Sequence, residues 1–571
     1  MTDPSYISSA ATLGAVLDPA VMELRETSER WARLPLARKI EYARQALQGT
    51  ARTAEGQVQA AVAAKGLSPD SPATGEEWIA GPYITLRVLR LLIETLEGLR
   101  RDGRVPLDPS WVGRRKDGRA SVDVFPLTFY DQSLYAGFRA QVRMQDGVTP
   151  ENLDQHMAGF YRRKDPKGRV ALVLGAGNVA SIGPLDVVHK LFVEGQVVIL
   201  KFNPVNEYLG PFFEDAFGDL IRDGYLRTAY GGADVGAYLC EHPEVDEIHI
   251  TGGAPTHDAI VFGVGPEGKE RKHRNEPLLE KRITSELGNV SPVIVAPGRW
   301  STSQIRFQAQ NLATQMVQNS SFNCNAARII VTHEAWPQRQ ELLDELGHVI
   351  SRLPARPAYY PGAEERYERF VAAYPTADRF GPRATGALPA ALAVGLDPDA
   401  VDQPAFSTES FCPFTAEVPL VAQSAAEFLG RAATFCNDRL YGTLNAEILI
   451  DPMTEKRLRP ELEAAIDELR YGTVAINQWP AMGFALGSTP WGAFPGHTLD
   501  DIQSGMGSVH NTFLFDRPEK TVIRGPFTVF PKPPWFVTHA NAHRVGERLA
   551  RFEADPGPLR LAGIVLAALR G

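Results

Sequence analysis

Short apolar runs rich in β-branched residues alternate with helix-like stretches between residues 169 and 335, and this alternation constrains the fold more than any other feature. The runs are VALVLG, VVILKF, EIHITGG, SPVIVAP and ARIIVT. Strand and helix in alternation predict a parallel sheet with right-handed crossovers. A second series follows, TAEVPLV, NAEILI and TVAINQ, so the sequence predicts two α/β domains with a ligand cleft between them.

The segments before and after these series carry helical periodicity instead. Residues 20 to 100 repeat apolar residues at three- and four-residue spacing. Residues 535 to 571 predict two helices split by Pro556-Gly557-Pro558, the first amphipathic and the second almost wholly apolar. The second helix, Leu559 to Leu569, is too short to cross a bilayer at 1.5 Å per residue. The basic stretch from 268 to 282 is expected to be a solvated loop.

Charge and cysteine content exclude several classes of protein. The net charge of −9 argues against general nucleic-acid binding, which needs basic patches that neutralise phosphates. The start, MTDPSYISSA, has neither the basic nor the apolar region of a signal peptide, and no stretch approaches the ~18 apolar residues of a membrane span. The four cysteines form no CxxC pair and have no histidine cluster beside them, so we expect no metal site and a reducing cytoplasm.

The segment RVALVLGAGNVASIGP, residues 169 to 184, looks like a dinucleotide-binding fingerprint. An apolar strand runs into Gly175-x-Gly177-x-x-Ala180, and such glycines let a backbone approach a pyrophosphate at a helix N-terminus. The fingerprint requires an acidic residue about 20 positions later to hold a ribose, but the next strand ends in Lys201. The motif therefore needs another interpretation, and Asn178 is the polar residue inside it that must be explained.

Three further positions carry reactive side chains, and each alone has an ordinary structural interpretation. Cys324 precedes a strand in the polar segment NSSFNCNAAR, with Arg328 four residues on, which suits a reactive thiol but also fits a structural cysteine. Glu286 precedes Leu-Gly and a buried strand, so it is either a solvated strand end or a base with a raised pKa. Glu409 lies in STESFCPF, where an ordinary turn is the alternative.

The order of these elements resembles the NAD(P)-dependent aldehyde dehydrogenase superfamily across roughly residues 20 to 530. The segments YGTLNAEI, GTVAIN and STPWGAFPG also look like landmarks of that family. The main matches are Ala176 to Ala180 for a turn whose Asn donates to an oxyanion, Lys201 for a strand-ending lysine, Gly252-Gly253 for a glycine turn, Glu286 to Asn289 for Glu-Leu-Gly-Gly, Asn319 to Cys324 for Asn-x-Gly-Gln-x-Cys, and Glu409 to Pro413 for Glu-x-Phe-Gly-Pro.

The resemblance implies a catalytic role for three residues. Cys324 would attack the aldehyde carbonyl as a thiolate. The side-chain amide of Asn178 and the backbone N–H of Cys324 would stabilise the oxyanion. After hydride leaves for the nicotinamide, Glu286 would take a proton from the water that hydrolyses the thioester.

The resemblance also implies a site for NAD or NADP. Lys201 would contact the adenosine ribose, and Glu409 would hold the nicotinamide ribose. The other residues implied at the cofactor are Gly177, Gly232, Gly253 and Phe411. An acidic residue that favours NAD often lies three positions after the strand-ending lysine, but Pro204 stands there, so the choice between NAD and NADP stays open.

Several features depart from the family pattern. Ser321 and Phe322 replace the Gly and Gln that usually precede the cysteine, so the turn and the substrate channel are expected to differ. Pro204 and the Thr-Gly-Gly turn are also found in the branch that transfers acyl groups to coenzyme A. We therefore keep three alternatives: oxidation of an aldehyde to a carboxylic acid, acyl-CoA reduction in an acylating enzyme, and a non-catalytic scaffold with the same fold.

The expected organisation is an α/β, aldehyde-dehydrogenase-like chain with two α/β domains, a small oligomerisation hairpin and a helical C-terminal extension. We expect a cytoplasmic homodimer or homotetramer that acts on a small-molecule aldehyde, with the extension packed across a subunit, capping the substrate entrance. The alternatives are burial on the chain's own body and a position at a membrane surface, which usually requires a more strongly charged face. The predicted boundaries are 1–140 and 166–290 for the NAD(P)-binding domain, 291–485 for the catalytic domain, 141–165 and 500–534 for the oligomerisation elements with the hairpin near 141 to 165, and 535–571 for the extension.

Overall fold

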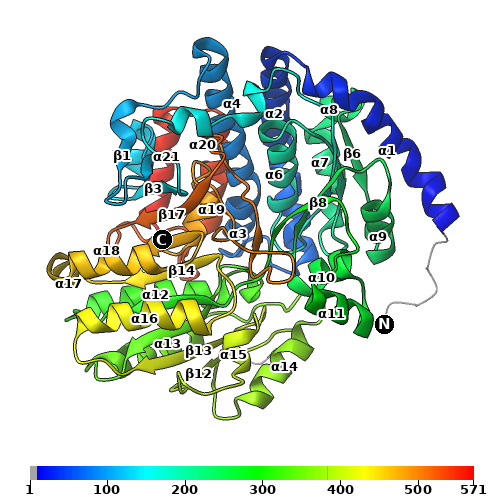
Figure 1. The fold of residues 1–571 in the computed structure, drawn as a ribbon. Coiled ribbons are helices and arrows are strands. Elements are labelled where there is room, and N and C mark those ends of the chain that lie inside the picture. The colour runs from blue at the N-terminus through cyan, green and yellow to red at the C-terminus, as the bar shows by residue number, and fades with distance from the viewer. Residues whose placement is uncertain (1–9, 382–383) are drawn as a thin grey trace.

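The computed structural model describes residues 10–381 and 384–571, and within these residues the strands form two sheets (Figure 1). The smaller sheet is parallel except for its last pair, β16 with β8. Its six strands, in spatial order, are β16 (Gly505–Met506), β8 (Arg282–Glu286), β7 (Glu247–Thr251), β4 (Val170–Leu174), β5 (Val197–Lys201) and β6 (Leu226–Ala229). The predicted strand-and-helix alternation is thus present as a parallel sheet.

The larger sheet has a parallel middle and antiparallel strands at both edges. The parallel part runs from β17 to β12, while β1, β2 and β3 at one edge and β11 at the other are antiparallel to their neighbours. Its eleven strands among the described residues are β1 (Val112–Arg114), β2 (Ala120–Phe125), β3 (Arg139–Met144), β17 (Pro518–Arg524), β15 (Thr473–Ile476), β14 (Asn445–Leu449), β9 (Ser291–Val295), β10 (Ala327–His333), β13 (Phe414–Leu420), β12 (Ala390–Ala393) and β11 (Asp378–Phe380).

Helices cover both sheets. Around the smaller sheet and the antiparallel strands they are α1 (Ala10–Ala32), α2 (Leu36–Ala64), α3 (Thr74–Trp78), the π-helix η1 (Ile79–Tyr83), α4 (Ile84–Asp102), η2 (Pro109–Trp111), α5 (Phe129–Leu134), η3 (Leu153–His156), η4 (Gly159–Arg162), α6 (Ile182–Val188), the π-helix η5 (His189–Val193), η6 (Glu207–Leu209), α7 (Gly210–Ala216), α8 (Gly218–Arg222), α9 (Ala233–Glu241), α10 (Ala254–Phe262) and α11 (Gly265–Arg274). Over the larger sheet and at the C-terminal end they are α12 (Thr302–Val317), η7 (Gln318–Ser321), α13 (Arg339–Ser351), α14 (Ala363–Ala373), α15 (Pro404–Ser407), α16 (Ala425–Arg439), α17 (Pro452–Arg457), α18 (Arg459–Glu468), α19 (Ala481–Ala485), α20 (Ala542–Ala554) and α21 (Pro558–Ala568).

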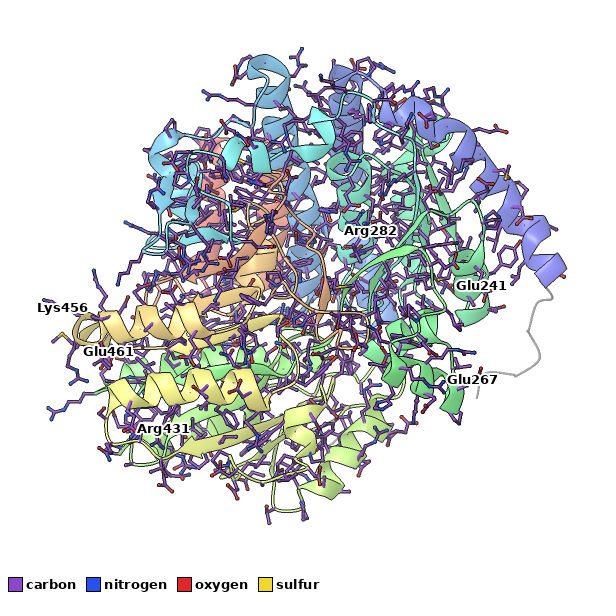
Figure 2. All side chains as sticks on the ribbon, in the orientation of Figure 1. Glu241, Glu267, Arg282, Arg431, Lys456 and Glu461 are labelled. Carbon is purple, nitrogen blue, oxygen red and sulfur yellow. The ribbon has the colours of Figure 1, made fainter. Side chains whose placement is uncertain are left out.

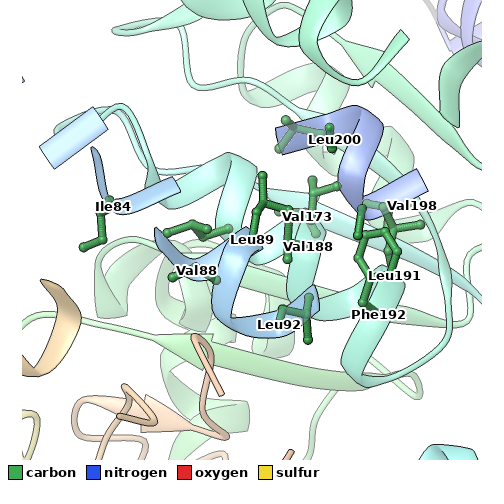
Figure 3. Close-up of a cluster of buried hydrophobic side chains, with 14 of the residues drawn as sticks. Ile84, Val88, Leu89, Leu92, Val173, Val188, Leu191, Phe192, Val198 and Leu200 are labelled. Atoms are coloured by element: carbon green, nitrogen blue, oxygen red, sulfur yellow. The ribbon is translucent and has the colours of Figure 1, made fainter. Parts of the chain in front are cut away.

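The predicted N-terminal helices pack against the smaller sheet through an apolar face of α4 (Figure 3). Apolar residues recur on α4 at helical spacing, and they meet the apolar side of α6 and η5. Burial of each such side chain contributes about 1.5–3 kcal/mol. The labelled members of this cluster are Ile84, Val88, Leu89, Leu92, Val173, Val188, Leu191, Phe192, Val198 and Leu200. The sheet that begins at β4 is therefore fixed by helices from the start of the chain.

The C-terminal extension packs on its own chain. Helix α20 contacts α3, η1 and α4, and its residues Val545, Leu549 and Phe552 are buried, as the amphipathic pattern predicted. Glu553 is 1 % exposed and forms ion pairs with Arg87 at 2.8 Å and Arg90 at 2.6 Å. Helix α20 therefore packs on elements of its own chain. The extension contributes no residue to the main cavity described below, so the structure gives it no capping role there.

Two local expectations were wrong. Residues 141–165 form no hairpin, because 141–144 belong to β3 and its antiparallel partners are β2 and β17. The stretch from 268 to 282 is not a loop throughout, because residues up to Arg274 continue helix α11. A Pro in the first turn and glutamates four residues before arginines favour this helix, including Glu270 and Arg274 at 2.9 Å.

Candidate active site

Cys324 lies in a tight loop between η7 and β10. Asn319, Ser320 and Ser321 have φ values of +53°, +54° and +70°, in the left-handed region that non-glycine residues seldom adopt. Each such residue costs on the order of 1–3 kcal/mol unless its surroundings enforce the conformation. Here the buried Arg328 guanidinium donates to Ser321 Oγ and to the carbonyl oxygens of Ser321, Asn323 and Cys412. Arg328 thus anchors the loop.

The thiol of Cys324 is hydrogen-bonded to a buried carboxyl. Its Sγ donates to Oε1 of Glu286 at 3.3 Å. Burial raises the pKa of the Cys324 thiol well above its usual value, and the carboxyls of Glu286 and Glu409 add to the rise. The sequence suggested that Arg328 would favour a thiolate, but its guanidinium is committed to the loop backbone and Ser321. The structure therefore holds a protonated thiol with a proton acceptor beside it.

Glu286 ends strand β8 and is 4 % exposed, so it is not the solvated strand end that we kept as an alternative. Burial raises its pKa to about 7, and the charge of Asp186 adds to the rise. Its Oε2 is buried and has no hydrogen-bond partner within the described part of the chain. A carboxyl with this pKa can accept a proton near neutral pH, which a general base requires.

Asn178 lies on the other side of the same loop. It follows β4, and its Nδ2 donates to Phe322 O at 2.9 Å. An amide nitrogen carries two hydrogens, so this bond leaves one donor for an oxyanion. The backbone carbonyl oxygen of Asn178 accepts hydrogen bonds from Lys65 Nζ at 3.3 Å, Asn319 Nδ2 at 3.0 Å and Tyr359 OH at 3.2 Å. Three side chains and the backbone of the cysteine loop thereby fix the position of Asn178.

A buried ion pair supports this arrangement from helix α2 and helix α3. Lys65 Nζ lies 2.8 Å from Glu77 Oε1 and 3.1 Å from Asn319 Oδ1. Burial opposes the charge of Lys65, but the Glu77 carboxylate outweighs it, so the pKa of Lys65 is raised and the group stays charged. Nearby, Glu76 accepts from the Asn319 backbone N–H at 2.8 Å. The N-terminal helices thus reach the catalytic loop.

A cavity of about 1340 Å³ opens at Cys324, Glu286 and Asn178. It runs between the two sheets, past the carboxyl ends of β4, β5 and β7. Its walls include Lys201, Gly232, Gly253, Glu409 and Phe411, which were predicted at the cofactor. Gly177 is the exception, since it does not line the cavity. A Cβ at Gly177 would lie 2.7 Å from Asn203 Oδ1, so this glycine allows close packing beneath the turn.

The features of this cavity fit a dinucleotide. Gly232 and Gly253 precede helices α9 and α10, so two helix N-termini face the cavity, where a pyrophosphate is stabilised by unpaired backbone N–H groups. Lys201 ends β5 and supplies a donor deeper in the wall. Glu409 presents a buried Oε1 with no partner among the described residues. A Cβ at Gly288 would lie 2.2 Å from Glu409 Oε2, so the Leu-Gly turn leaves room for this carboxyl.

Sequence reasoning missed several residues at this site. Tyr360 and Arg366 line the cavity, and Lys65 and Tyr359 hold Asn178, but none of them lies in a recognisable motif. Asp186 is 0 % exposed beside Glu286, and here a signal existed. A single carboxylate inside the apolar helical run IGPLDVVHKLF is unexpected unless it has a buried partner.

Two negative observations concern the residues that the structure describes. No group of three or more His, Cys, Asp or Glu side chains in residues 10–381 and 384–571 is placed to hold a metal ion. Over the same residues, no helix combines the length and the apolar character needed to span a bilayer.

Known aldehyde dehydrogenases are similar to this chain in part of its sequence and in most of its fold. Residues 133–357 match the aldehyde dehydrogenase family. The fold matches an aldehyde dehydrogenase from Mycobacterium tuberculosis complexed with NAD+, with a TM-score of 0.59 and 15% identity, over 92% of this chain and 91% of that one. It also matches an NADP-dependent glyceraldehyde-3-phosphate dehydrogenase from Bacillus halodurans complexed with NADP, with a TM-score of 0.59 and 15% identity, over 89% and 91% of the two chains.

The similarity in sequence is more limited. A 4-trimethylaminobutyraldehyde dehydrogenase A from Danio rerio is 24% identical over 202 residues, which is 34% of this chain and 36% of the relative. A 4-trimethylaminobutyraldehyde dehydrogenase from Oryzias latipes is 24% identical over 179 residues, 31% of this chain and 32% of the relative. The chain thus spans about a third of the length of these curated relatives. The resemblance to the NAD(P)-dependent aldehyde dehydrogenase superfamily is confirmed, and the chain has the α/β fold of that superfamily.

Proposed function

We propose that this chain oxidises an aldehyde to a carboxylic acid with NAD or NADP, through a cysteine thiohemiacetal and a thioester. The observation that carries the proposal is the convergence of Cys324, Glu286 and Asn178 at one end of a cavity of about 1340 Å³. Glu286 Oε1 lies 3.3 Å from the thiol, and Asn178 keeps one amide hydrogen unengaged by the cysteine loop. Nucleophile, base and oxyanion donor thus lie together.

The residues of the chain perform four tasks in this proposal. Glu286 removes the proton of the Cys324 thiol, and the sulfur attacks the aldehyde carbonyl. Asn178 Nδ2 and the Cys324 backbone N–H donate to the oxygen that becomes negative, a contribution of about 2.7–4 kcal/mol per donor in comparable sites. The bound cofactor supplies a hydride acceptor. Glu286 releases this proton to solvent before it takes another from the water that hydrolyses the thioester. The sulfur leaves as a thiolate, and the Glu286 carboxyl returns a proton to it.

Binding of the cofactor rests on the walls of the cavity. Helix N-termini at Gly232 and Gly253 would hold the pyrophosphate, and Lys201 and Glu409 would contact the two riboses. Phe411 would pack beside the nicotinamide end. Pro204 stands at the position where an acidic side chain would favour NAD. The cavity walls are therefore compatible with both NAD and NADP. The known complexes with NAD+ and with NADP on this fold support both.

An experiment decides between hydrolysis and transfer to coenzyme A. Purified enzyme is mixed with NAD or NADP and acetaldehyde, hexanal, dodecanal or benzaldehyde, and absorbance at 340 nm is followed with and without coenzyme A. We expect NADH or NADPH and a free carboxylic acid. An acyl-CoA product that requires coenzyme A would assign the chain to the acylating alternative. If the cofactor binds but no aldehyde yields NADH or NADPH, the result would favour the non-catalytic scaffold.

We infer a homo-oligomer in the cytoplasm. All four cysteines, Cys240, Cys324, Cys412 and Cys436, are unpaired thiols, which supports a reducing compartment. Helix α21 packs on α20 but leaves apolar side chains uncovered, among them Leu559 at 88% exposure and Leu566 at 64%. Contact with a second copy would remove these side chains from water. Sedimentation at micromolar concentration tests assembly, and a single 62.6 kDa species would contradict it.

A further inference from the structure

A second cavity, of about 820 Å³, lies at the opposite end of the smaller sheet from the main cavity. Its lining includes Arg169, Gln196 and Arg282, which stand at the amino ends of β4, β5 and β8. Arg282 is labelled in Figure 2, and its side chain is 53% exposed. Among the described residues the two cavities share no lining residue, so both can hold a ligand at the same time. The volume is that of a small-molecule site.

The acidic residues of the second cavity are each paired with a cation that is not part of its lining. The pairs are Glu194 with Lys190 at 2.8 Å, Asp516 with Arg162 at 3.0 Å, and Glu519 with Arg115 at 3.2 Å. These carboxylates are therefore neutralised from outside the cavity, and they do not balance the basic residues of the lining.

Two arginines of the lining, Arg163 and Arg169, are exposed and unpaired. Neither guanidinium has a hydrogen-bond or ion-pair partner within residues 10–381 and 384–571. The other Arg and Lys side chains of the lining are engaged: Arg282 with Glu247 at 2.8 Å, Lys167 with Asp165 at 2.7 Å, and Lys520 with three backbone carbonyls. Two positive charges of the second cavity are thus left for a ligand.

Two buried side chains of the same lining present acceptor atoms without a partner in the described part of the chain, Gln196 Oε1 and His189 Nδ1. Gln196 Nε2 donates to Glu247 Oε2 at 2.8 Å, and this bond fixes the amide, because a carboxylate only accepts. Burial lowers the pKa of His189, so its ring is neutral at pH 7. Its Nε2 faces Glu194 Oε1 at 3.7 Å and carries the proton, which leaves Nδ1 as an acceptor. Buried acceptors of this kind require hydrogen-bond donors.

We propose that the second cavity binds a phosphate ester that carries hydroxyl groups. A phosphate monoester has a charge of about −1.5 to −2 near pH 7, which matches the two unpaired guanidinium groups of Arg163 and Arg169. A guanidinium also pairs with two phosphate oxygens at once, whereas a carboxylate would supply only one charge for the two arginines. The hydroxyl groups of the ester donate to Gln196 Oε1 and His189 Nδ1.

Calorimetry with glycerol 3-phosphate tests the proposal. The enzyme is first saturated with NADH, so that the main cavity is filled, and we expect one further saturable site per chain. Propyl phosphate keeps the charge but lacks the hydroxyl groups, and it should bind about fivefold more weakly. Glycerate keeps hydroxyl groups but has a single negative charge, and it should bind more weakly by about tenfold or more.

Matched double variants assign the binding to the second cavity. Arg163→Gln combined with Arg169→Gln removes both unpaired charges and should weaken the binding of glycerol 3-phosphate by about tenfold or more. Arg163→Lys combined with Arg169→Lys keeps the charges and should recover part of this loss. Arg104→Gln combined with Arg352→Gln, at two exposed arginines outside the lining, is the control and should bind as the wild type does. Thermal melting verifies that each protein is folded.

Three results would each overturn the proposal. They are no saturable heat in the wild type, equal affinity of the glutamine double variant at Arg163 and Arg169 and of the control, and equal affinity of the wild type for glycerol 3-phosphate and propyl phosphate. None of these measurements uses aldehyde oxidation. The test of the second cavity therefore stands even if the proposed function fails, and the two failures are distinguishable.

Discussion

The Sγ of Cys324 donates to Oε1 of Glu286 at 3.3 Å, so the two groups share one proton before any substrate arrives. Burial raises the pKa of both groups, that of Glu286 to about 7. Formation of a Cys324 thiolate before the aldehyde binds is unfavourable, because a buried thiolate would have no cation beside it. Proton transfer to Glu286 is therefore expected to accompany attack on the aldehyde.

Replacement of the nucleophile tests this assignment first. Cys324→Ala should abolish aldehyde oxidation while NAD or NADP binds as in the wild type, since the thiol is a small part of the cavity wall. Absorbance at 340 nm measures turnover, and calorimetry measures cofactor binding. Cys436→Ala, at a buried cysteine of α16 that does not line the cavity, is the control and should retain activity. Oxidation that persists in Cys324→Ala would reject the site.

Replacement of the base separates two steps of the reaction. Glu286→Gln should slow thioester hydrolysis by about 10²–10⁴, because an amide accepts no proton from water. The observable is an NADH burst followed by a slow steady state. In the wild type, acyl-enzyme decay should rise with pH through about 7, where the carboxyl loses its proton, and the variant should lack this rise. Equal slowing of burst and steady state would contradict the role.

The buried ion pair between Lys65 and Glu77 leads to a prediction about stability. Lys65→Met leaves the Glu77 carboxylate buried without its cation, which should lower the free energy of unfolding by about 3–5 kcal/mol. Lys65→Met combined with Glu77→Gln should recover most of this loss. Urea denaturation measures each value. Lys272→Met, in the partly exposed pair with Asp258, should change stability by less than about 1 kcal/mol.

Glu447 on β14 predicts a pH dependence of stability. Burial raises its pKa to about 8 from an unfolded value of 4.5, despite hydrogen bonds from Gln315 and Asn311. The folded state then binds more protons than the unfolded state across this window, so stability falls as pH rises from about 4.5 to 8. Thermal melting from pH 5 to 8 should show a smaller fall in Glu447→Gln than in the wild type. Parallel profiles would contradict this prediction.

The extension at residues 535–571 is expected to be part of the folded body. Glu553→Ala removes the carboxylate between Arg87 and Arg90 and should lower the free energy of unfolding by about 3–5 kcal/mol. Deletion of 535–571 would expose the faces of α3, η1 and α4 that α20 covers, so we expect aggregation. Arg560→Ala, on the exposed side of α21, is the control. Unchanged melting of the truncated protein would refute the prediction.

Much of the fold could be predicted from the sequence because its signals are local. Alternating apolar runs identified the strands that contain Val170 and Val293, and helical periodicity identified the helices of both ends. Two errors have physical causes. Charged residues at four-residue spacing extend helix α11 through a stretch that looked like a loop. The antiparallel partners of β3 lie in distant segments, and no local pattern identifies them.

Some residues of the candidate site could be predicted from the sequence, and others only from the folded chain. Cys324, Glu286 and Asn178 were named from motifs, and the structure brings their side chains to one cavity. Lys65 and Tyr359 could not be named, because contacts with Asn178 span 113 and 181 positions. The polar face of β7 and β8 could be predicted in principle, since EIHIT and RITSE each place polar residues at every second position of a strand. Their pairing and their contact with Asp186 depend on the strand register, which only the folded chain supplies.

The position of β17 between β15 and β3 has a consequence for synthesis on the ribosome. Gln145 donates to the carbonyl of Pro518 across 373 positions of the chain. At about 5–20 residues per second, strand β3 therefore waits roughly 20–75 s for its neighbour, and the edge of β15 stays unpaired for a few seconds after it emerges. An open edge recruits other strands. The nascent chain is thus expected to need chaperone protection until residue 524 has left the exit tunnel, and β17 is the strand that closes the sheet.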